Sequence, residues 1–350
     1  MRIGIDISPV KTGHKFRGTG SYTENLVKSL GKYAKGNEYK FFARQEKLPA
    51  GLDLVHYPYF EPFFLTLPLR KAFPTIVTVH DLIPLLFPEH FPCGFRGGVK
   101  WQIQKWSLKG AVAVIVDSEC SQKDVIKLAG IDEGKIFVVP LAAGEEFRPM
   151  TDKKELEKIK NKYHLPEKFV LYVGDATWNK NIPSLIKAVQ KINVPLVLVG
   201  KQLADSTFDR SNPWNKDLIK VEKLIEGDKR ISKLGFVPKI DLVAIYNLAT
   251  VCVQPSFYEG FGLPVLEAMV CGCPVVTSKT SSLSEVAGEG VLYVDPKDID
   301  SIASGIGEIY FNSGLRKEFS QNGLLQAKKF SWKKTAQETV RVYRQVLDTK

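Results

Sequence analysis

Residues 254–295 read QPSFYEGFGLPVLEAMVCGCPVVTSKTSSLSEVAGEGVLYVD, and this stretch decides the fold that we expect. The apolar run Val251–Val253 predicts a buried strand that leads into a polar, glycine-bearing loop, Ser256–Gly262. Pro264 suits the first turn of a helix, because the N–H that proline lacks would be unpaired there. Pro274–Thr277 then predicts a second strand. The pattern is strand, glycine loop, helix and strand.

The loop and the start of the helix favour a ligand with an anionic centre. Gly260 and Gly262 let the backbone approach a ligand closely, and the unpaired amides of a helix N-terminus attract an anion. Glu259 and Glu267 flank this region, and a carboxylate accepts hydrogen bonds from a diol but repels a phosphate. A nucleotide-sugar, with a diphosphate in the middle and hydroxyls at both ends, fits these features.

Glu259 and Glu267, with seven residues between them inside SFYEGFGLPVLEAMVCGCPVV, resemble the E-x7-E motif of retaining glycosyltransferases of family 4. In that family the first glutamate meets the donor sugar and the second binds the ribose hydroxyls. The resemblance therefore implies a catalytic role for Glu259 and donor binding by Glu267. It also implies donor contacts from the residues between them, Gly260, Phe261, Gly262 and Leu263.

The resemblance covers nearly the whole chain and implies the GT-B fold, in which two Rossmann-like parallel-sheet domains face an interdomain cleft. The alternation of strands and helices in both halves independently predicts two α/β domains. We expect an acceptor-side domain at residues 1–165, a donor-binding domain at 166–330, and a last helix, 331–350, that crosses back to the first domain. The expected boundary lies near Leu165–Lys168.

The N-terminus predicts a strand, Ile3–Ile7, followed by a loop, Ser8–Gly20, that carries Gly13, Gly18 and Gly20. The family resemblance implies that Gly18 and Gly20 approach the donor phosphates and the acceptor. The alternative is a flexible connection between strand and helix, because RGTGS does not match G-x-G-x-x-G.

A His-Asp pair follows the expected strand Thr75–Val79, at the end where open α/β sheets place ligand groups. The segment HDLIPL resembles mannosyl- and rhamnosyltransferase sequences, which implies that His80 touches the donor sugar and belongs to the catalytic residues. The alternative is a histidine whose hydrogen bonds are satisfied by nearby backbone.

The second half repeats the pattern with a strand, Phe169–Val173, and then GDATWNKNIPSLIKA. Lys180 falls on the family's lysine that contacts the donor diphosphate, which implies a catalytic role in offsetting the charge there. Asn179 stands where the family has an arginine, so one cation is missing. The resemblance also implies that the backbone at Phe236 and Val237 meets the nucleobase.

The composition limits the partners and the location that we expect. The chain has 350 residues and a net charge of +11, which suits anionic ligands or an anionic membrane surface. No basic tract alternates with aromatic residues, so we expect no nucleic-acid partner. The odd count of five cysteines predicts reduced thiols. With no signal peptide or spanning run, we expect a cytoplasmic enzyme, peripheral on the cytoplasmic membrane face.

Two segments of the first half are candidates for the acceptor side. The expected helix Phe95–Gly110 is basic and carries Trp101 and Trp106, which favours a bilayer surface; packing against the sheet is the alternative. The Pro- and Phe-rich segment Tyr57–Pro74 predicts an acceptor-side loop.

The leading hypothesis is a retaining transferase that moves a hexose, mannose or a related sugar, from a nucleoside-diphosphate-sugar to a saccharide or lipid-linked saccharide hydroxyl. We expect no metal and no cofactor. The alternatives are a nucleotide-sugar 2-epimerase or phosphorylase of the same fold, and a non-catalytic module that binds nucleotide-sugars. A glycoside hydrolase is disfavoured, because two carboxylates alone leave the anion-binding loop without a purpose.

Overall fold

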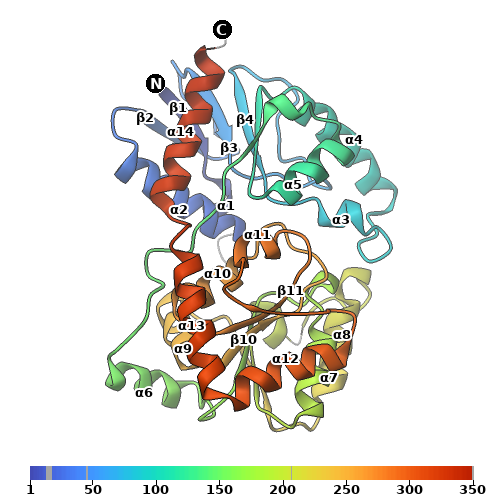
Figure 1. The fold of residues 1–350 in the computed structure, drawn as a ribbon. Coiled ribbons are helices and arrows are strands. Elements are labelled where there is room, and N and C mark those ends of the chain that lie inside the picture. Colours follow the sequence, from blue (N-terminus) through green and yellow to red (C-terminus); the bar gives the residue numbers. More distant parts are fainter. Residues whose placement is uncertain (13–17, 45, 206, 349–350) are drawn as a thin grey trace. The chain divides into compact units, whose positions relative to one another are not determined.

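The computed structural model describes residues 1–12, 18–44, 46–205 and 207–348, and it contains two compact units (Figure 1). The first unit comprises Met1–Ala142 and Phe330–Lys350, and the second comprises Ala143–Lys329. The division thus falls before the boundary that the sequence suggested near residue 165. The reason is that α6 (Lys153–Lys162) packs against α9 (Lys239–Leu248) in the second unit. Lys162 Nζ and Tyr163 Oη donate hydrogen bonds to Asp241 Oδ2 at 2.6 and 2.7 Å.

The first unit is built on a six-stranded sheet in the order β2-β1-β3-β4-β5-β6, in which all neighbouring strands are parallel. Every residue of β3, β4 and β5 is buried, as is typical of parallel strands covered on both faces. The strands are β1 (Arg2–Asp6), β2 (Glu38–Phe42), β3 (Leu54–Tyr57), β4 (Thr75–Val79), β5 (Ala113–Val116) and β6 (Ile136–Val138).

Helices of the first unit come from both ends of the chain. The last helix, α14 (Trp332–Asp348), packs beside α2 (Gly18–Tyr33) (Figure 1). Two hydrogen bonds fix it: Tyr343 Oη lies 2.7 Å from His56 Nδ1, and Thr335 Oγ1 donates to the Pro140 carbonyl at 2.8 Å. The other helices are α1 (Ser8–Lys11), α3 (Ile83–Leu86), α4 (Gly94–Lys109) and α5 (Glu119–Asp124).

The expected loop Ser8–Gly20 is partly wrong. Ser8–Lys11 forms the short helix α1, with Pro9 in its first turn, where proline is tolerated. Gly18 and Gly20 lie in the first turn of α2 and not in a loop. Gly13 lies outside the described residues.

The second unit has another six-stranded parallel sheet, in the order β12-β11-β10-β7-β8-β9. Its strands are β7 (Val170–Val173), β8 (Leu196–Val199), β9 (Ile231–Gly235), β10 (Val251–Gln254), β11 (Val275–Ser278) and β12 (Leu292–Val294). Besides α6 and α9, its helices are α7 (Ile182–Lys191), α8 (Lys216–Ile225), α10 (Leu263–Val270), α11 (Leu283–Ala287), α12 (Ile299–Phe311) and α13 (Ser313–Ala327). The strand, loop, helix and strand expected around residues 251–277 are confirmed as β10, α10 and β11.

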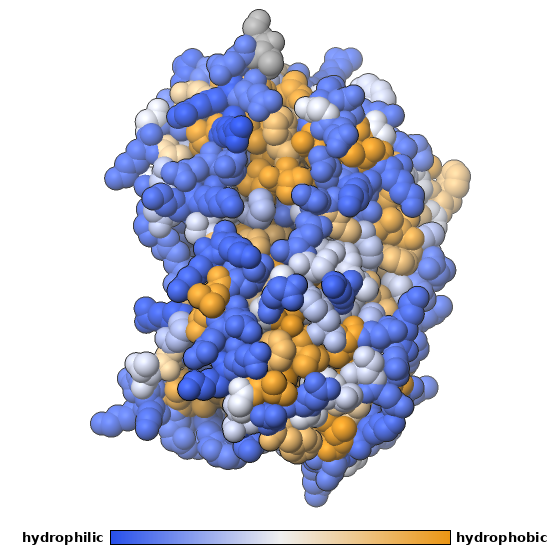
Figure 2. Space-filling view, in the orientation of Figure 1, coloured by the Kyte–Doolittle hydropathy of each residue, from blue (hydrophilic) through white to orange (hydrophobic). Residues whose placement is uncertain are grey.

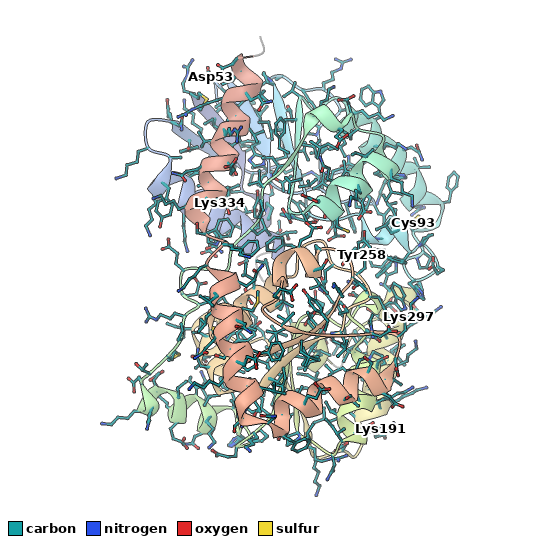
Figure 3. The ribbon with its side chains drawn as sticks, viewed as in Figure 1. Asp53, Cys93, Lys191, Tyr258, Lys297 and Lys334 are labelled. Atoms are coloured by element: carbon teal, nitrogen blue, oxygen red, sulfur yellow. The ribbon has the colours of Figure 1, made fainter. Side chains whose placement is uncertain are left out.

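The five cysteines are free, and three of them, Cys252, Cys271 and Cys273, are buried. Cys93, the residue before α4, is exposed (Figure 3). Across the described ranges, no helix is both long enough and apolar enough to span a bilayer.

Candidate active site

The loop after β10 is shaped by a left-handed residue at its end. Gly262 has φ 104° and ψ 44° and is the N-cap residue of α10. A Cβ atom at this position would lie 2.8 Å from Leu283 Cδ2, so both the backbone conformation and the space require glycine. Pro264 occupies the first turn of α10, as the sequence indicates. The polar loop therefore turns sharply into the helix between Gly260 and Leu263.

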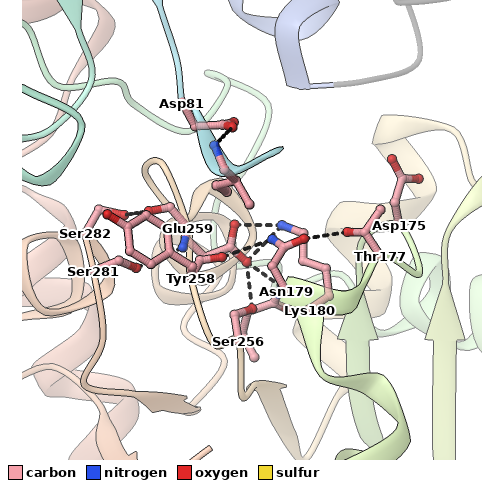
Figure 4. Close-up of polar contacts among 12 residues, drawn as sticks. Asp81, Asp175, Thr177, Asn179, Lys180, Ser256, Tyr258, Glu259, Ser281 and Ser282 are labelled. Carbon is pink, nitrogen blue, oxygen red and sulfur yellow. Dashed lines mark hydrogen bonds and ion pairs between the residues drawn. The ribbon is translucent and has the colours of Figure 1, made fainter. Parts of the chain in front are cut away.

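The structure brings Lys180 and Glu259 together inside the second unit (Figure 4). Lys180 Nζ donates to Glu259 Oε1 at 2.8 Å and to Oε2 at 2.7 Å. The Glu259 carboxylate, in a residue only 5% exposed, also accepts from Ser256 Oγ at 2.7 Å. A buried carboxylate is stable in its charged form when such donors surround it. The pair therefore presents a fixed positive and negative charge at the end of β10.

This pairing refines the role expected for Lys180. The sequence placed its ammonium at the donor diphosphate, whereas the structure also gives it a carboxylate partner. An ammonium group has three N–H donors, and two of them point at Glu259, so one remains for a phosphate oxygen. Lys180 can therefore bridge the carboxylate and an incoming anion.

Hydrogen bonds of Asn179 connect the segment before α7 to the loop that carries Glu259. Its side chain is buried, accepts from Thr177 Oγ1 at 2.8 Å, and donates from Nδ2 to the Tyr258 carbonyl at 3.0 Å (Figure 4). Its own carbonyl accepts from the Phe257 amide at 2.8 Å. The interpretation of Asn179 as merely a missing cation is therefore incomplete, because the residue holds the loop that carries Glu259.

Asn181 and two serines complete this support, and sequence reasoning missed all three. Asn181 has φ 55°, in the left-handed region that asparagine tolerates, and its Nδ2 donates to the carbonyls of Pro255 and Pro296 at 3.0 and 2.7 Å. Ser281 Oγ accepts from the Glu259 amide at 2.8 Å, and Ser282 Oγ donates to the Glu259 carbonyl at 2.9 Å. Of these three residues, only Asn181 could have been found from the sequence, because asparagine is a preferred residue immediately before a helix, here α7.

Glu267 lies one turn into α10 and is partly buried beside Tyr246, whose hydroxyl donates to Glu267 Oε2 at 3.2 Å. Burial raises the pKa of Glu267 to about 7, although the Tyr246 hydrogen bond and the charge of Lys239 oppose it. Burial therefore favours the neutral acid relative to the ionised carboxylate that the sequence interpretation assumed. In either state it has hydrogen-bonding atoms for a diol.

The remaining donor-binding candidates of this unit lie at turns. Phe236 is 52% exposed and Val237 is buried, and both follow β9. Leu263, the first residue of α10, is partly buried. Contacts with a nucleobase or ribose at these positions stay predictions.

His80 belongs to the first unit, where it follows β4. Its Nδ1 lies 2.7 Å from Asp117 Oδ2, and its ring meets that of Tyr22 edge-on at a centroid distance of 4.6 Å. Its side-chain partner is thus a buried carboxylate, and a backbone hydrogen bond with Pro58 also raises the pKa of His80. Burial lowers the pKa of His80, but the charge and hydrogen bond of Asp117 outweigh this effect, so the pKa lies above its ordinary value.

The described residues hold no group of three or more His, Cys, Asp or Glu side chains that could bind a metal ion. Gly18 and Gly20 lie at the start of α2 in the first unit, and a Cβ on Gly18 would meet no atom of the described residues within 4 Å.

Comparison with known families and proteins agrees with this architecture. The family Glycosyl transferases group 1 matches residues 153–326, and Glycosyltransferase Family 4 matches residues 17–143. The chain is 33% identical to O-antigen chain mannosyltransferase B of Escherichia coli over 305 residues, which cover 83% of this chain and 75% of that protein. It is 30% identical to the serotype-specific mannosyltransferase WbdA of Escherichia coli over 79% of this chain and 34% of that longer protein.

Among solved structures, sucrose-phosphate synthase from Thermosynechococcus elongatus is similar over 100% of both chains, with a TM-score of 0.78 and 21% sequence identity. This likeness concerns the fold, and the sequence relatives carry the assignment to a family. The chain therefore belongs to glycosyltransferase family 4, with two α/β units of the GT-B fold.

Proposed function

We propose that this glycosyltransferase moves a mannosyl or closely related hexosyl group from a nucleoside-diphosphate-sugar to a hydroxyl of a saccharide or lipid-linked saccharide. The observation that carries the proposal is the ion pair of Lys180 and Glu259 at the end of β10. The names of the relatives in Escherichia coli, both mannosyltransferases, support mannose as the transferred sugar.

The roles proposed for the residues follow from their charges. Lys180 offsets the negative charge that grows on the diphosphate as its bond to the sugar breaks, which is preorganised electrostatic stabilisation. Glu259 accepts hydrogen bonds from sugar hydroxyls, and Glu267 binds the ribose diol. His80, through Nε2, contacts the donor sugar. Gly18, Gly20, the Gly260–Leu263 turn and the Phe236–Val237 backbone line the donor.

The proposed reaction uses no metal and no cofactor. The bond between the anomeric carbon and the diphosphate oxygen breaks, and the acceptor oxygen bonds to that carbon on the same face. As the family resemblance implies, the leaving phosphate takes the acceptor proton. Configuration is thereby retained, and nucleoside diphosphate is the second product.

A panel of UDP-, GDP-, ADP- and dTDP-sugars, tested by thermal shift and then by turnover, examines this function. A ligand at one hundred times its Kd raises the free energy of unfolding by about 2.7 kcal/mol, which a thermal shift detects. Incubation with the donor alone tests the alternative, because a 2-epimerase converts the donor without an acceptor. Binding without any turnover, with acceptors present, would indicate a non-catalytic module.

We also propose that the acceptor is presented at an anionic membrane face and that the enzyme associates with it peripherally. The α4 helix and the loop before β4 expose large apolar side chains to solvent, with Phe95 88%, Trp106 63% and Phe64 55% exposed. On the side of the first unit that carries α3 and α4, apolar residues lie at the surface among hydrophilic ones (Figure 2). Basic residues of α4 accompany them, namely Arg96, Lys100, Lys105 and Lys109.

Packing against the sheet explains only part of the aromatic content of α4. Trp101 is partly buried against the core of the first unit, as the alternative interpretation held. Trp106 and Phe95 face solvent instead, so packing does not account for them. Exposed aromatic and basic side chains on one helix suit the headgroup region of a bilayer.

A further inference from the structure

We propose that Asp117 is a positioning residue for the transfer, which holds the His80 ring in one orientation toward the donor sugar; this inference rests on the proposed function of His80. Asp117 follows β5 and His80 follows β4, and these strands are neighbours in the first sheet. Val116 pairs in register with Val79, so the chain places the two residues side by side where both strands end. The sequence pattern singles out His80 but not Asp117.

Asp117 and the residues that follow it hold both the side chain and the backbone of His80. The Asp117 Oδ2 atom lies 2.7 Å from His80 Nδ1. Ser121 Oγ donates to the His80 carbonyl at 3.0 Å, and Ser118 Oγ accepts from the Ser121 amide at 3.0 Å. The segment that runs from β5 into α5 therefore fixes this histidine at two points.

Stability of the fold does not explain why a carboxyl group is buried at position 117. Within the described part of the chain, the Oδ1 atom of Asp117 is buried without a hydrogen-bond partner, and Oδ2 meets only His80. A buried carboxyl group with a single partner costs free energy of folding that an apolar residue would avoid. Residues that carry such a cost are typical of functional sites, so we infer that Asp117 is present for its effect on His80.

Asp117 lies deeper in the first unit than His80, so it acts through the histidine. The His80 side chain is 14% exposed, whereas the Asp117 side chain is 2% exposed. Because Asp117 binds Nδ1, the ring meets the donor sugar through Nε2. A carboxylate at Nδ1 keeps a proton on that nitrogen and stabilises the ring when Nε2 is protonated as well. The Nε2–H group can then donate to a hydroxyl of the sugar.

Tyr22 of α2 packs against the same imidazole and restricts its rotation. The two rings meet edge-on at a centroid distance of 4.6 Å, and the Tyr22 hydroxyl lies 3.2 Å from Thr78 Oγ1. The same Thr78 oxygen lies 2.8 Å from His56 Nε2, and His56 Nδ1 lies 2.7 Å from Tyr343 Oη of α14. This buried network holds Tyr22 in place, so the ring of His80 has little room to turn.

The charges around His80 give this inference a consequence that titration can measure. Burial has the largest effect and lowers the pKa of His80, but the charges of Asp117 and Asp81 and hydrogen bonds of the ring shift it above its ordinary value. His56 and Tyr22 are uncharged at neutral pH, because burial lowers the pKa of His56 to about 3 and raises that of Tyr22. Replacing Asp117 by asparagine removes the nearest carboxylate and leaves the burial, so the pKa of His80 should fall.

A pH titration of the full chain by histidine-detected NMR tests the contact without any donor. The chain has five histidines, and the signals of His80 are those that disappear in His80→Gln. We expect the neutral ring of the parent to carry its proton on Nδ1, and Asp117→Asn to lower the pKa of His80 by at least about one pH unit. The control is Asp132→Asn, because this exposed aspartate accepts from the Gly134 amide and asparagine keeps that bond. A parent ring with its proton on Nε2, or the same pKa in Asp117→Asn and the parent, would overturn the inference.

Turnover of a nucleoside-diphosphate-mannose separates positioning from folding. We expect Asp117→Asn to lower kcat on the order of 100-fold, the usual effect of a misplaced group, and to leave the Kd for nucleoside diphosphate unchanged. Because Asp117 acts through His80, the double variant Asp117→Asn/His80→Gln should be no slower than His80→Gln alone. Full kcat in Asp117→Asn, or a further loss in the double variant, would contradict a positioning role. A parent without turnover would instead contradict the proposed function, and the NMR titration would still decide the role of Asp117.

Discussion

Replacing Glu267 by glutamine should stabilise the fold at alkaline pH but not at pH 5. Burial beside Tyr246 raises the pKa of the Glu267 carboxyl from 4.5 to about 7. The folded chain therefore binds this proton more tightly than the unfolded chain, and the free energy of unfolding falls as pH rises between about 4.5 and 7. At about 1.36 kcal/mol per pH unit, the full loss above this range is roughly 3 kcal/mol. Glutamine keeps the shape of the neutral acid and avoids this loss.

Urea unfolding at pH 5 and pH 8.5 measures the effect. The control is Glu226→Gln, which removes an exposed carboxylate from the same unit. We expect Glu267→Gln to gain up to roughly 3 kcal/mol over the parent at pH 8.5 and well under 1 kcal/mol at pH 5. The reasoning is refuted if the gain is the same at both pH values or equals that of the control.

The same position should show a conflict between stability and binding. At pH 8.5 the native carboxylate is ionised, so Glu267→Gln and Glu267→Ala should both weaken nucleoside-diphosphate binding, by roughly 1.5–3 kcal/mol. Calorimetry with the nucleoside diphosphate checks this. Unchanged affinity in both variants would remove Glu267 from the donor site.

Four other predictions follow from the site and the surface. Lys180→Ala should cost about 3–5 kcal/mol of stability, because it leaves Glu259 buried without its cation. Adding Glu259→Gln to this variant should restore stability but not turnover. Recovery of turnover in the double variant would show that Lys180 acts only through folding. Asn179→Arg should lower the melting temperature, because Asn179 is buried and bonded to the Tyr258 carbonyl; tighter donor binding in a stable variant would contradict this role. Turnover should survive EDTA, and a loss that magnesium or manganese restores would disprove the metal-free mechanism. The fraction of protein that sediments with anionic vesicles should fall as salt rises, since basic residues contribute about 1 kcal/mol each at such a surface. This fraction should fall further when Lys100, Lys105 and Lys109 become Glu. A protein that stays in the supernatant at low salt would favour a soluble acceptor.

Local sequence patterns were sufficient for most of the secondary structure. The strand Thr75–Val79 has the bounds that its apolar pattern predicts, and the helix expected at Phe95–Gly110 is α4, Gly94–Lys109. The segment Ser8–Gly20 was the exception, because its glycines suggested a loop while Pro9 and the N-terminus of α2 sit in helical turns. A glycine in the sequence indicates that the backbone can adopt many conformations. It does not indicate which of them the surrounding structure selects.

The candidate site was predictable only in part. Its two glutamates lie within one contiguous stretch, so the motif placed them on the loop and the helix without tertiary information. The partner of Glu259, Lys180, is 79 positions away, and that of His80, Asp117, is 37 positions away. No local pattern reports contacts at such separations. The raised pKa of Glu267 likewise depends on burial in the folded chain, which outweighs the lowering effect of the hydrogen bond from Tyr246 of another helix.

The most direct test of the central claim is an NMR measurement of the product anomer. Purified chain is incubated with a nucleoside-diphosphate-α-mannose and a mannoside acceptor, and the new glycosidic bond is assigned from its one-bond C–H coupling. The proposed function predicts an α-linked product, stoichiometric release of nucleoside diphosphate, and loss of both in the stable Lys180→Ala/Glu259→Gln variant. A β-linked product, donor conversion without an acceptor, or full transfer by that variant would contradict it.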